Sequence, residues 1–213
     1  GSLGVSSLVC LLNNGNDDQL ETKQSMLGPF WRLNSPRTEN GESIVRSKTP
    51  GPCVFVDLYY VDTEGTPLAG VEVDVWHAST VGLYESQDST QADMNLRGKF
   101  TTDETGHVWF SSIKPSGYPI PTDGAVGKLL AAQNRHPFRP AHLHALAFKE
   151  GFKTLTSQIY SEDDEKLESD VQFGVTEALI TRYQRHDEPY LGDFSVEVPW
   201  YTMDCTLVME RGK

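Results

Sequence analysis

Short runs in which apolar and polar residues alternate dominate the chain from residue 50 onward. The run 52–62 (PCVFVDLYYVD) and the run 71–79 (VEVDVWHAS) are rich in β-branched and aromatic residues, and a turn-forming stretch, 64–70 (EGTPLAG), separates them. A period of two places successive side chains on opposite faces, which is typical of a half-buried β-strand. We therefore predict a strand, a turn and a second strand over residues 52–79.

Three later segments repeat this pattern. Residues 98–115 turn at 103–106 (DETG), residues 141–161 turn at Glu150-Gly151, and residues 195–211 close the chain as one or two strands. Many short strands at regular spacing are typical of an antiparallel sandwich or barrel. The expected fold is mainly β: an antiparallel β-sandwich with loops that carry the functional residues.

Two segments depart from the strand pattern. Residues 3–14 (LGVSSLVCLLNN) predict a short helix that ends at Asn13-Asn14-Gly15, and the polar residues 15–25 predict a linker. Residues 170–186 (DVQFGVTEALITRYQRH) also predict a helix, with weak apolar periodicity.

Charge and composition exclude several classes of partner. The 213 residues carry a formal net charge of −12, whereas nucleic acid or an anionic membrane surface requires a basic face. No apolar run approaches the roughly 18 residues of a membrane-spanning helix. Cys10, Cys53 and Cys205 are few and scattered, and no basic leader with an apolar core opens the chain. These features favour a cytoplasmic protein with buried thiols.

The segment RPAHLH, residues 139–144, carries two of the six histidines. On a strand, positions two apart share a face, so His142 and His144 project together and Leu143 faces the opposite layer. This spacing suits two nitrogen ligands of one metal, and equally suits two ordinary hydrogen-bonded histidines. His77, in the strand-like VDVWHAS, is a possible third imidazole, although a structural role is favoured for it. Trp76, Trp109 and Trp200 are expected in the core.

Two tyrosines are further candidate ligands. Tyr84 follows the strand at 71–79, and Tyr118 lies between glycine and proline in the loop 115–124 (PSGYPIPTDG). Taken alone, each could be a turn aromatic that packs over the sheet. Forming a phenolate at neutral pH costs about 4 kcal/mol, and a bound trivalent cation could more than offset this cost.

A set of motifs resembles the intradiol ring-cleavage dioxygenases of the catechol and hydroxyquinol 1,2-dioxygenase type. The motifs follow the family's order from about residue 26 to the C-terminus: GPFW, VDVWHASTVGLYESQ, LRGKFTTDETGHVWF, KPSGYPIPTDGAVG and RPAHLHALAFKEGFKTLTSQIY. The resemblance implies a β-sandwich and a non-haem Fe(III) cofactor. It implies that the ligands of this iron are Tyr84, Tyr118, His142 and His144.

The resemblance also implies catalytic roles. Tyr118 would be the phenolate that leaves the metal as substrate binds, Arg139 the active-site arginine, and Gln158 a glutamine near the substrate. A fixed positive charge with planar donors can stabilise negative charge that develops on the substrate. A structural ion pair for Arg139 and ordinary sheet-edge polarity for Gln158 are the alternatives.

By the same resemblance, a pocket-edge segment and one residue after the strand TSQIY contact the substrate: Met26, Leu27, Gly28, Pro29, Phe30 and Val171. The form LGPF favours hydroxyquinol as substrate and maleylacetate as product, with catechol and cis,cis-muconate as the alternative. The partners would then be a small aromatic diol or triol and O2. Residues 1–25 would be the remnant of an N-terminal helical region that forms homodimers, and residues 26–213 the catalytic domain.

Two other classes of protein fit the same strands. One is a non-catalytic β-sandwich module whose two histidines are incidental or bind copper or zinc. The other is a transthyretin-like carrier or hydrolase that needs no iron. Fold alone does not separate them, and the difference lies in whether Tyr84 and Tyr118 reach the histidines.

Overall fold

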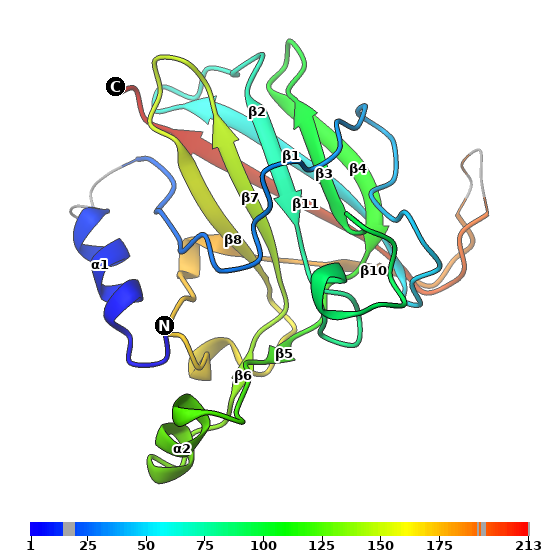
Figure 1. The fold of residues 1–213 in the computed structure, drawn as a ribbon. Coiled ribbons are helices and arrows are strands. Elements are labelled where there is room, and N and C mark those ends of the chain that lie inside the picture. The colour runs from blue at the N-terminus through cyan, green and yellow to red at the C-terminus, as the bar shows by residue number, and fades with distance from the viewer. Residues whose placement is uncertain (15–19, 191, 193–194, 213) are drawn as a thin grey trace.

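The computed structural model describes residues 1–14, 20–190, 192 and 195–212, and two β-sheets packed face to face form its body (Figure 1). One sheet has the strand order β10-β11-β1-β4 and the other β3-β2-β7-β8-β9. A separate two-stranded ribbon joins β5 to β6. The strands are β1 Cys53–Asp62, β2 Glu72–Trp76, β3 Arg97–Thr101, β4 His107–Ile113, β5 Tyr118–Pro119, β6 Phe138–Arg139, β7 His142–Phe148, β8 Leu155–Ser161, β9 Ile180–Thr181, β10 Gln184–His186 and β11 Trp200–Met209.

Helices are short and lie at the periphery of the sheets. They are α1 Val5–Asn13, α2 Ala125–Ala132 and the 3-10 turns η1 Glu85–Gln87, η2 Leu167–Ser169 and η3 Glu177–Leu179. Helix α1 lies beside the sandwich, and α2 projects from the end that carries β5 and β6 (Figure 1). Among the described residues, no helix combines the length and hydrophobicity that a membrane span needs.

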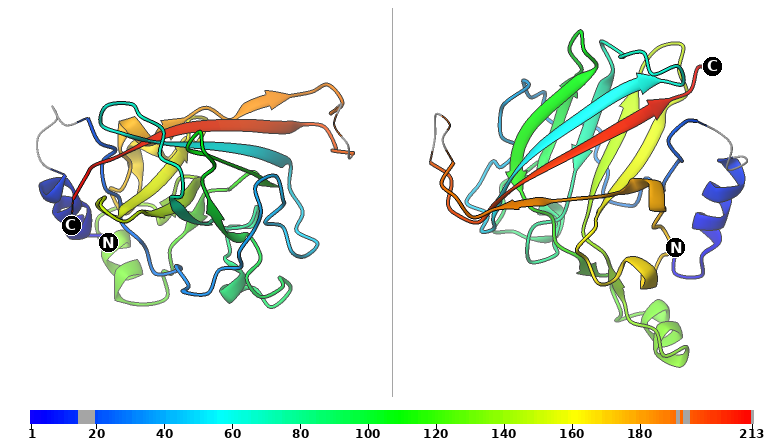
Figure 2. Two further views of the ribbon diagram at one scale, coloured as in Figure 1. Left: turned by 90° about the horizontal axis from the view of Figure 1, so that it is seen from above. Right: turned by 180° about the vertical axis from the view of Figure 1, so that it is seen from behind.

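The predicted sandwich is confirmed. On β1, Val54, Val56, Leu58 and Tyr60 alternate inward and are at most 2% exposed, and they join one core with inward residues of the other sheet. The two sheets form separate layers when the molecule is seen from above (Figure 2). Most pairings are antiparallel, but β1 pairs with β11, and β8 with β9, in parallel.

The helix predicted at 170–186 is wrong. This segment forms a loop, the turn η3 and the short strands β9 and β10. The loop begins where the Asp170 carboxylate accepts the backbone N–H of Gly174 at 2.8 Å, and Phe173 adopts a left-handed φ of 54°. A side chain that hydrogen-bonds nearby backbone N–H groups competes with helix formation. The predicted helix near the N-terminus is confirmed as α1, whereas the linker at 15–25 lies partly outside the described residues.

The tryptophan predictions hold for one residue of three. Trp76 is fully buried, but Trp109 is 37% exposed and Trp200 is half-buried. Trp109 lies between the inward residues Val108 and Phe110 of β4, so strand alternation turns its indole outward. The three cysteines are half-buried free thiols.

The outer face of the five-stranded sheet forms a second, smaller packing region. Trp76 projects there, since its neighbour Val75 points into the main core. Tyr84 and Tyr118 pack with it, and Phe30 and Trp31 cover the cluster. The chain that enters the sandwich after α1 crosses this face of the sheet (Figure 1). A second buried cluster of side chains therefore lies on the outer face of this sheet, separate from the core between the two sheets.

Candidate metal centre

Strand β7 places two imidazoles on the outer face of the sheet. His142 and His144 are each 2% exposed, and Leu143 between them enters the main core. His142 Nδ1 donates to the Pro140 carbonyl at 2.7 Å, which leaves Nε2 with its lone pair. His144 stacks on Trp76, its cross-strand neighbour, with ring centroids 4.7 Å apart and planes 7° apart. Both rings are held firmly before any ligand binds.

Tyr84 reaches the imidazoles from the loop that follows β2. The ring of Phe30 stacks on it at 4.2 Å, and its side chain is 1% exposed. The loop turns at Gly82, where φ is +77° and a Cβ would lie 2.8 Å from the Cβ of Tyr118. Glycine is required there because both the backbone conformation and the close approach exclude a side chain.

Tyr118 comes from the ribbon of β5 and β6, in which it lies directly opposite Arg139. Its hydroxyl is 3.4 Å from that of Tyr84, and its ring centroid is 5.5 Å from that of His142. The rings of His142 and His144 are 4.8 Å apart, and those of Tyr84 and His144 are 6.4 Å apart. The structure therefore brings two phenol oxygens and two imidazoles together from three separate segments.

Burial sets the protonation states of His142, His144 and Tyr84. It lowers the pKa of His142 to about 3, helped by the charge of Arg139, and it lowers the pKa of His144 well below its usual value. Both imidazoles are therefore neutral at pH 7. Burial, followed by the neighbouring Tyr118, raises the pKa of Tyr84 well above its usual value despite the charges of Arg139 and Arg97. Ionising this phenol requires a further positive charge beside it.

These donors fit a trivalent cation. Neutral imidazoles supply lone pairs without charge, and phenol oxygens can supply negative charge to a cation that binds beside them. In the described part of the chain, the buried Nδ1 of His144 has no hydrogen-bond partner. No cluster of three His, Cys, Asp or Glu that could hold a metal occurs among those residues, so a metal at this position depends on the tyrosines.

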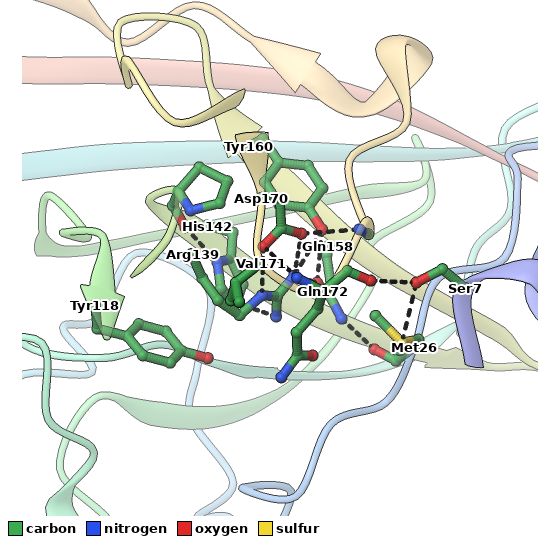
Figure 3. Close-up of polar contacts among 12 residues, drawn as sticks. Ser7, Met26, Tyr118, Arg139, His142, Gln158, Tyr160, Asp170, Val171 and Gln172 are labelled. Carbon is green, nitrogen blue, oxygen red and sulfur yellow. Dashed lines mark hydrogen bonds and ion pairs between the residues drawn. The ribbon is translucent and has the colours of Figure 1, made fainter. Parts of the chain in front are cut away.

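Arg139 is the centre of a buried polar network next to His142 (Figure 3). Its Nη1 donates to His142 Nε2 at 3.3 Å, and its Nη2 donates to Gln158 Oε1 at 2.8 Å and to the Tyr160 hydroxyl at 3.1 Å. Asp170 pairs with it at 3.2 Å. Strand register explains the arrangement, because Gln158 and Tyr160 on β8 lie opposite His144 and His142.

Gln158 also anchors the segment that covers the site. Its side-chain N–H donates to the carbonyl of Met26, while its Oε1 accepts from Arg139 and from Tyr160. Gln158 is fully buried on a central strand. Strand-edge polarity, the alternative considered for this residue, is therefore wrong.

A pocket of about 360 Å³ opens onto the candidate centre. Of the predicted substrate-binding residues, Gly28, Pro29 and Phe30 line it. Met26, Leu27 and Val171 are not part of its wall, and Val171 is 1% exposed. The buried side chains of Tyr118, Arg139 and His144 also line it. The sequence did not predict the other lining residues Ser2, Gln87, Pro119, Ile120, Pro121, Val126 and Gln172.

Some of the missed residues carried a usable signal. Ile120 and Pro121 follow Tyr118 directly, and Gln172 follows Val171, so their neighbours pointed to the pocket. Asp170 carried none, since acidic residues are frequent in this chain. His77 is a structural histidine, as predicted, because its two ring nitrogens contact the Ala78 carbonyl at 2.8 Å and the Ser112 hydroxyl at 2.7 Å.

Comparison with known proteins supplies the family. A family model described as Dioxygenase matches residues 26–204, a span that contains all four converging side chains. The chain belongs to the intradiol ring-cleavage dioxygenase family. Intradiol dioxygenases use non-haem Fe(III), the kind of ion that the donors of this chain fit.

Relatives within the intradiol dioxygenases include enzymes named for two substrates. The chain is 43% identical to a hydroxyquinol 1,2-dioxygenase of Rhizobium sp. (strain MTP-10005), over 87% of this chain and 63% of that protein. It is 37% identical to a catechol 1,2-dioxygenase of Candida albicans, over 87% of this chain and 62% of that protein. The chain thus spans less than two thirds of the length of these curated relatives.

Solved structures of intradiol dioxygenases share the fold. The hydroxyquinol 1,2-dioxygenase of Pseudomonas putida DLL-E4 matches with a TM-score of 0.90 and 34% identity, over 99% of this chain and 73% of that one. The catechol 1,2-dioxygenase of Pseudomonas arvilla C-1 matches with a TM-score of 0.91 and 29% identity, over 100% of this chain and 71% of that one.

Proposed function

We propose that this chain holds Fe(III) between Tyr84, Tyr118, His142 and His144 and cleaves the ring of a catechol-type substrate with O2. Hydroxyquinol is the favoured substrate, and maleylacetate is then the product. The observation that carries the proposal is the convergence of two buried phenols, 3.4 Å apart at their oxygens, with two neutral imidazoles. Bound Fe(III) would supply the Lewis acidity that ionises the phenols and activates a chelated catechol toward O2.

The two tyrosines have different roles in this proposal. Tyr118 lines the pocket, so its oxygen can take a proton from an arriving substrate hydroxyl. Tyr84 lies behind Phe30, is 1% exposed and is absent from the pocket wall, so it remains an anchor. The imidazoles, locked by Pro140 and Trp76, keep the position of the site while Tyr118 moves.

Arg139 acts on the substrate. It lines the pocket together with Tyr118 and His144, so its charge would lie close to a substrate bound there. A preorganised cation in a buried site stabilises negative charge as it develops. Arg139→Ala is expected to keep the iron colour and to lose most turnover, and loss of the colour would assign Arg139 a role in metal binding instead.

The pocket supports a substrate with a polar group besides the two chelating hydroxyls. Most of its other lining residues are apolar, and Gln87 and Gln172 contribute amide side chains. An amide can hydrogen-bond the third hydroxyl of hydroxyquinol, which catechol lacks. A relative named for hydroxyquinol is 43% identical to this chain, and a relative named for catechol is 37% identical. Catechol, cleaved to cis,cis-muconate, is the second candidate.

Residues 26–213 are the catalytic unit in this proposal, and residues 1–25 are an N-terminal region whose helix α1 lets two copies pair. Helix α1 supports the second point, because Leu8, Leu11 and Leu12 on it are 55%, 57% and 73% exposed. A leucine-rich helix face exposed to this extent is a favourable surface for association.

The test of the proposed activity is a visible spectrum of the iron-loaded protein, followed by anaerobic addition of hydroxyquinol or catechol and then by O2. We expect phenolate-to-iron charge-transfer absorption, a change in that band with substrate, and ring-opened dicarboxylate after O2. Tyr84→Phe should remove part of the band, while Tyr59→Phe, on the outer side of β1, should not. A featureless spectrum at full iron loading would contradict the proposal and favour a binding module.

A further inference from the structure

Asp170 contacts both Arg139 and the backbone of its own loop, residues 170–174. Its Oδ1 accepts from Arg139 Nε at 3.2 Å and from the Gln172 N–H at 3.2 Å. Its Oδ2 accepts from Arg139 Nη2 at 3.2 Å and from the Gly174 N–H at 2.8 Å. Each carboxylate oxygen thus serves one guanidinium donor and one loop donor, so the position of Arg139 and the shape of the loop depend on each other.

This pairing decides which edge of the guanidinium faces the candidate centre. The edge formed by Nε and Nη2 lies against Asp170, and Nη2 also reaches Gln158 and Tyr160. Nη1 remains, and it points to His142 Nε2 at 3.3 Å. Because a guanidinium is a rigid planar fork, holding one edge fixes the direction of the remaining donors.

The loop also confines Arg139 by direct packing. A Cβ at Gly174 would lie 2.9 Å from Arg139 Nη2 and 3.1 Å from Asp170 Oδ2. The left-handed φ of 54° at Phe173 brings Gly174 back toward its own Asp170. The guanidinium therefore lies between a carboxylate and a bare backbone, with little freedom to shift.

Burial makes the pair interdependent in charge. The side chains of Arg139 and Asp170 are 3% and 1% exposed, and an unpaired charge at such depth is strongly unfavourable. Burial opposes ionisation of Asp170, but the charge of Arg139 and the loop N–H groups outweigh it, so the pKa of Asp170 lies below its usual value. Asp170 is ionised at neutral pH and neutralises the arginine on the side away from the pocket.

We propose that Asp170 is the positioning residue for Arg139, and that the loop 170–174 is the support that holds the Nη1 edge of Arg139 on the side of His142 and the pocket, where it can face a bound substrate. This inference rests on the proposed function. The same loop carries Gln172 in the pocket wall, so one carboxylate couples the orientation of the catalytic cation to the outline of the pocket.

The experiment compares Asp170→Asn with Asp62→Asn in the iron-loaded chain. Asn has one side-chain oxygen where Asp170 uses two, so the variant loses one contact to the guanidinium and one contact to the loop. Asp62 is a matched control, because its Oδ1 accepts the N–H groups of Glu64 and Thr66, both at 2.9 Å, with the same spacing along the chain. It closes a turn remote from the pocket.

For Asp170→Asn, we expect kcat per bound iron to fall roughly 10- to 100-fold. KM should change less, and the charge-transfer band should stay that of the wild type. For Asp62→Asn, kcat per bound iron should stay that of the wild type. A crystal structure of Asp170→Asn should show the guanidinium turned away from His142. Gly174→Ala, which displaces the far end of Arg139 and keeps the carboxylate, should lower kcat in the same way.

Two outcomes would overturn the inference alone: an unchanged kcat in Asp170→Asn, or a loss that Asp62→Asn reproduces, since general destabilisation would then explain it. A wild-type chain that turns over neither hydroxyquinol nor catechol would remove the proposed function and this inference with it. The wild-type measurement therefore separates the two failures.

Discussion

Trp76 and His144 lie opposite each other on β2 and β7 and stack with planes 7° apart. The indole thus supports one candidate ligand from beneath, at a fully buried position. Replacing it with alanine leaves a large cavity under the imidazole, and such core truncations cost about 3–5 kcal/mol. We expect Trp76→Ala to lower the free energy of unfolding in urea by this amount and to reduce iron content.

Trp109→Ala is the control for this prediction. Its indole is 37% exposed on the outer side of β4, so the loss in stability should stay near or below about 1 kcal/mol, with iron content unchanged. Equal losses from the two variants would contradict the role assigned to Trp76.

Gly82→Ala should disturb Tyr118. The added Cβ would lie 2.8 Å from the Cβ of Tyr118, at a backbone φ of +77°. Gly65→Ala is a close match, because its φ is +81° and nothing lies within 4 Å of its Cβ. Both variants should lose roughly 1 kcal/mol or more to backbone strain. A weakened charge-transfer band should appear in Gly82→Ala alone, and the same loss of colour in both would rule out the contact as its cause.

Acid should destabilise the metal-free protein through its buried histidines. The folded pKa values are about 4 for His77 and about 3 for His142, and that of His144 is also far below the usual value, in each case chiefly because of burial. The unfolded chain, with histidine pKa values near 6.5, then binds more protons than the folded chain. Their stabilising effect is complete above about pH 6.5 and declines as the pH falls toward the folded values.

Urea unfolding between pH 5 and 8 measures this effect. Each buried histidine should add a slope of about 1 kcal/mol per pH unit below pH 6.5. His77→Gln removes one contribution, so its slope should be shallower than that of the wild type. A wild-type stability that stays constant from pH 8 to 5 would mean that these imidazoles are not buried in the folded state.

Gln172→Leu should alter substrate preference. Its amide lies in the pocket wall, and the loss of a hydrogen bond worth about 1 kcal/mol corresponds to roughly a fivefold effect. We expect kcat/KM for hydroxyquinol to fall by about this factor relative to kcat/KM for catechol. Val126→Ala, at the same wall but without a polar group, should change both substrates alike. A parallel loss for both substrates in Gln172→Leu would assign the recognition of the third hydroxyl to another residue.

Much of the fold was predictable because one face of strands such as β1 and β7 is buried in the main core, which makes hydrophobic side chains recur at every second position. The same rule, applied to β4, would have turned Trp109 outward. The parallel pairing of β1 with β11 was not predictable. It begins where Val54 lies opposite Tyr201, and these two residues are far apart in the sequence. Local patterns do not specify such long-range pairing.

The candidate site divides in the same way. The spacing of His142 and His144 identifies them as candidate ligands in the sequence, and so does the position of Tyr118 between glycine and proline. No sequence pattern identifies Asp170, because its role depends on its contact with Arg139, which lies 31 positions away in the chain. The helix predicted at 170–186 failed at this same residue, whose carboxylate is committed to Gln172 and Gly174.

The alternation along β7 also makes assembly of the centre an all-or-none event. If β7 paired one position out of register with β2 or β8, both imidazoles would point into the hydrophobic core and Leu143 would take their place on the outer face of the sheet. No half-correct pairing can gather the full donor set. With Fe(III) bound as proposed, the return of the charge-transfer absorption during refolding would therefore report that β7 has paired in the correct register.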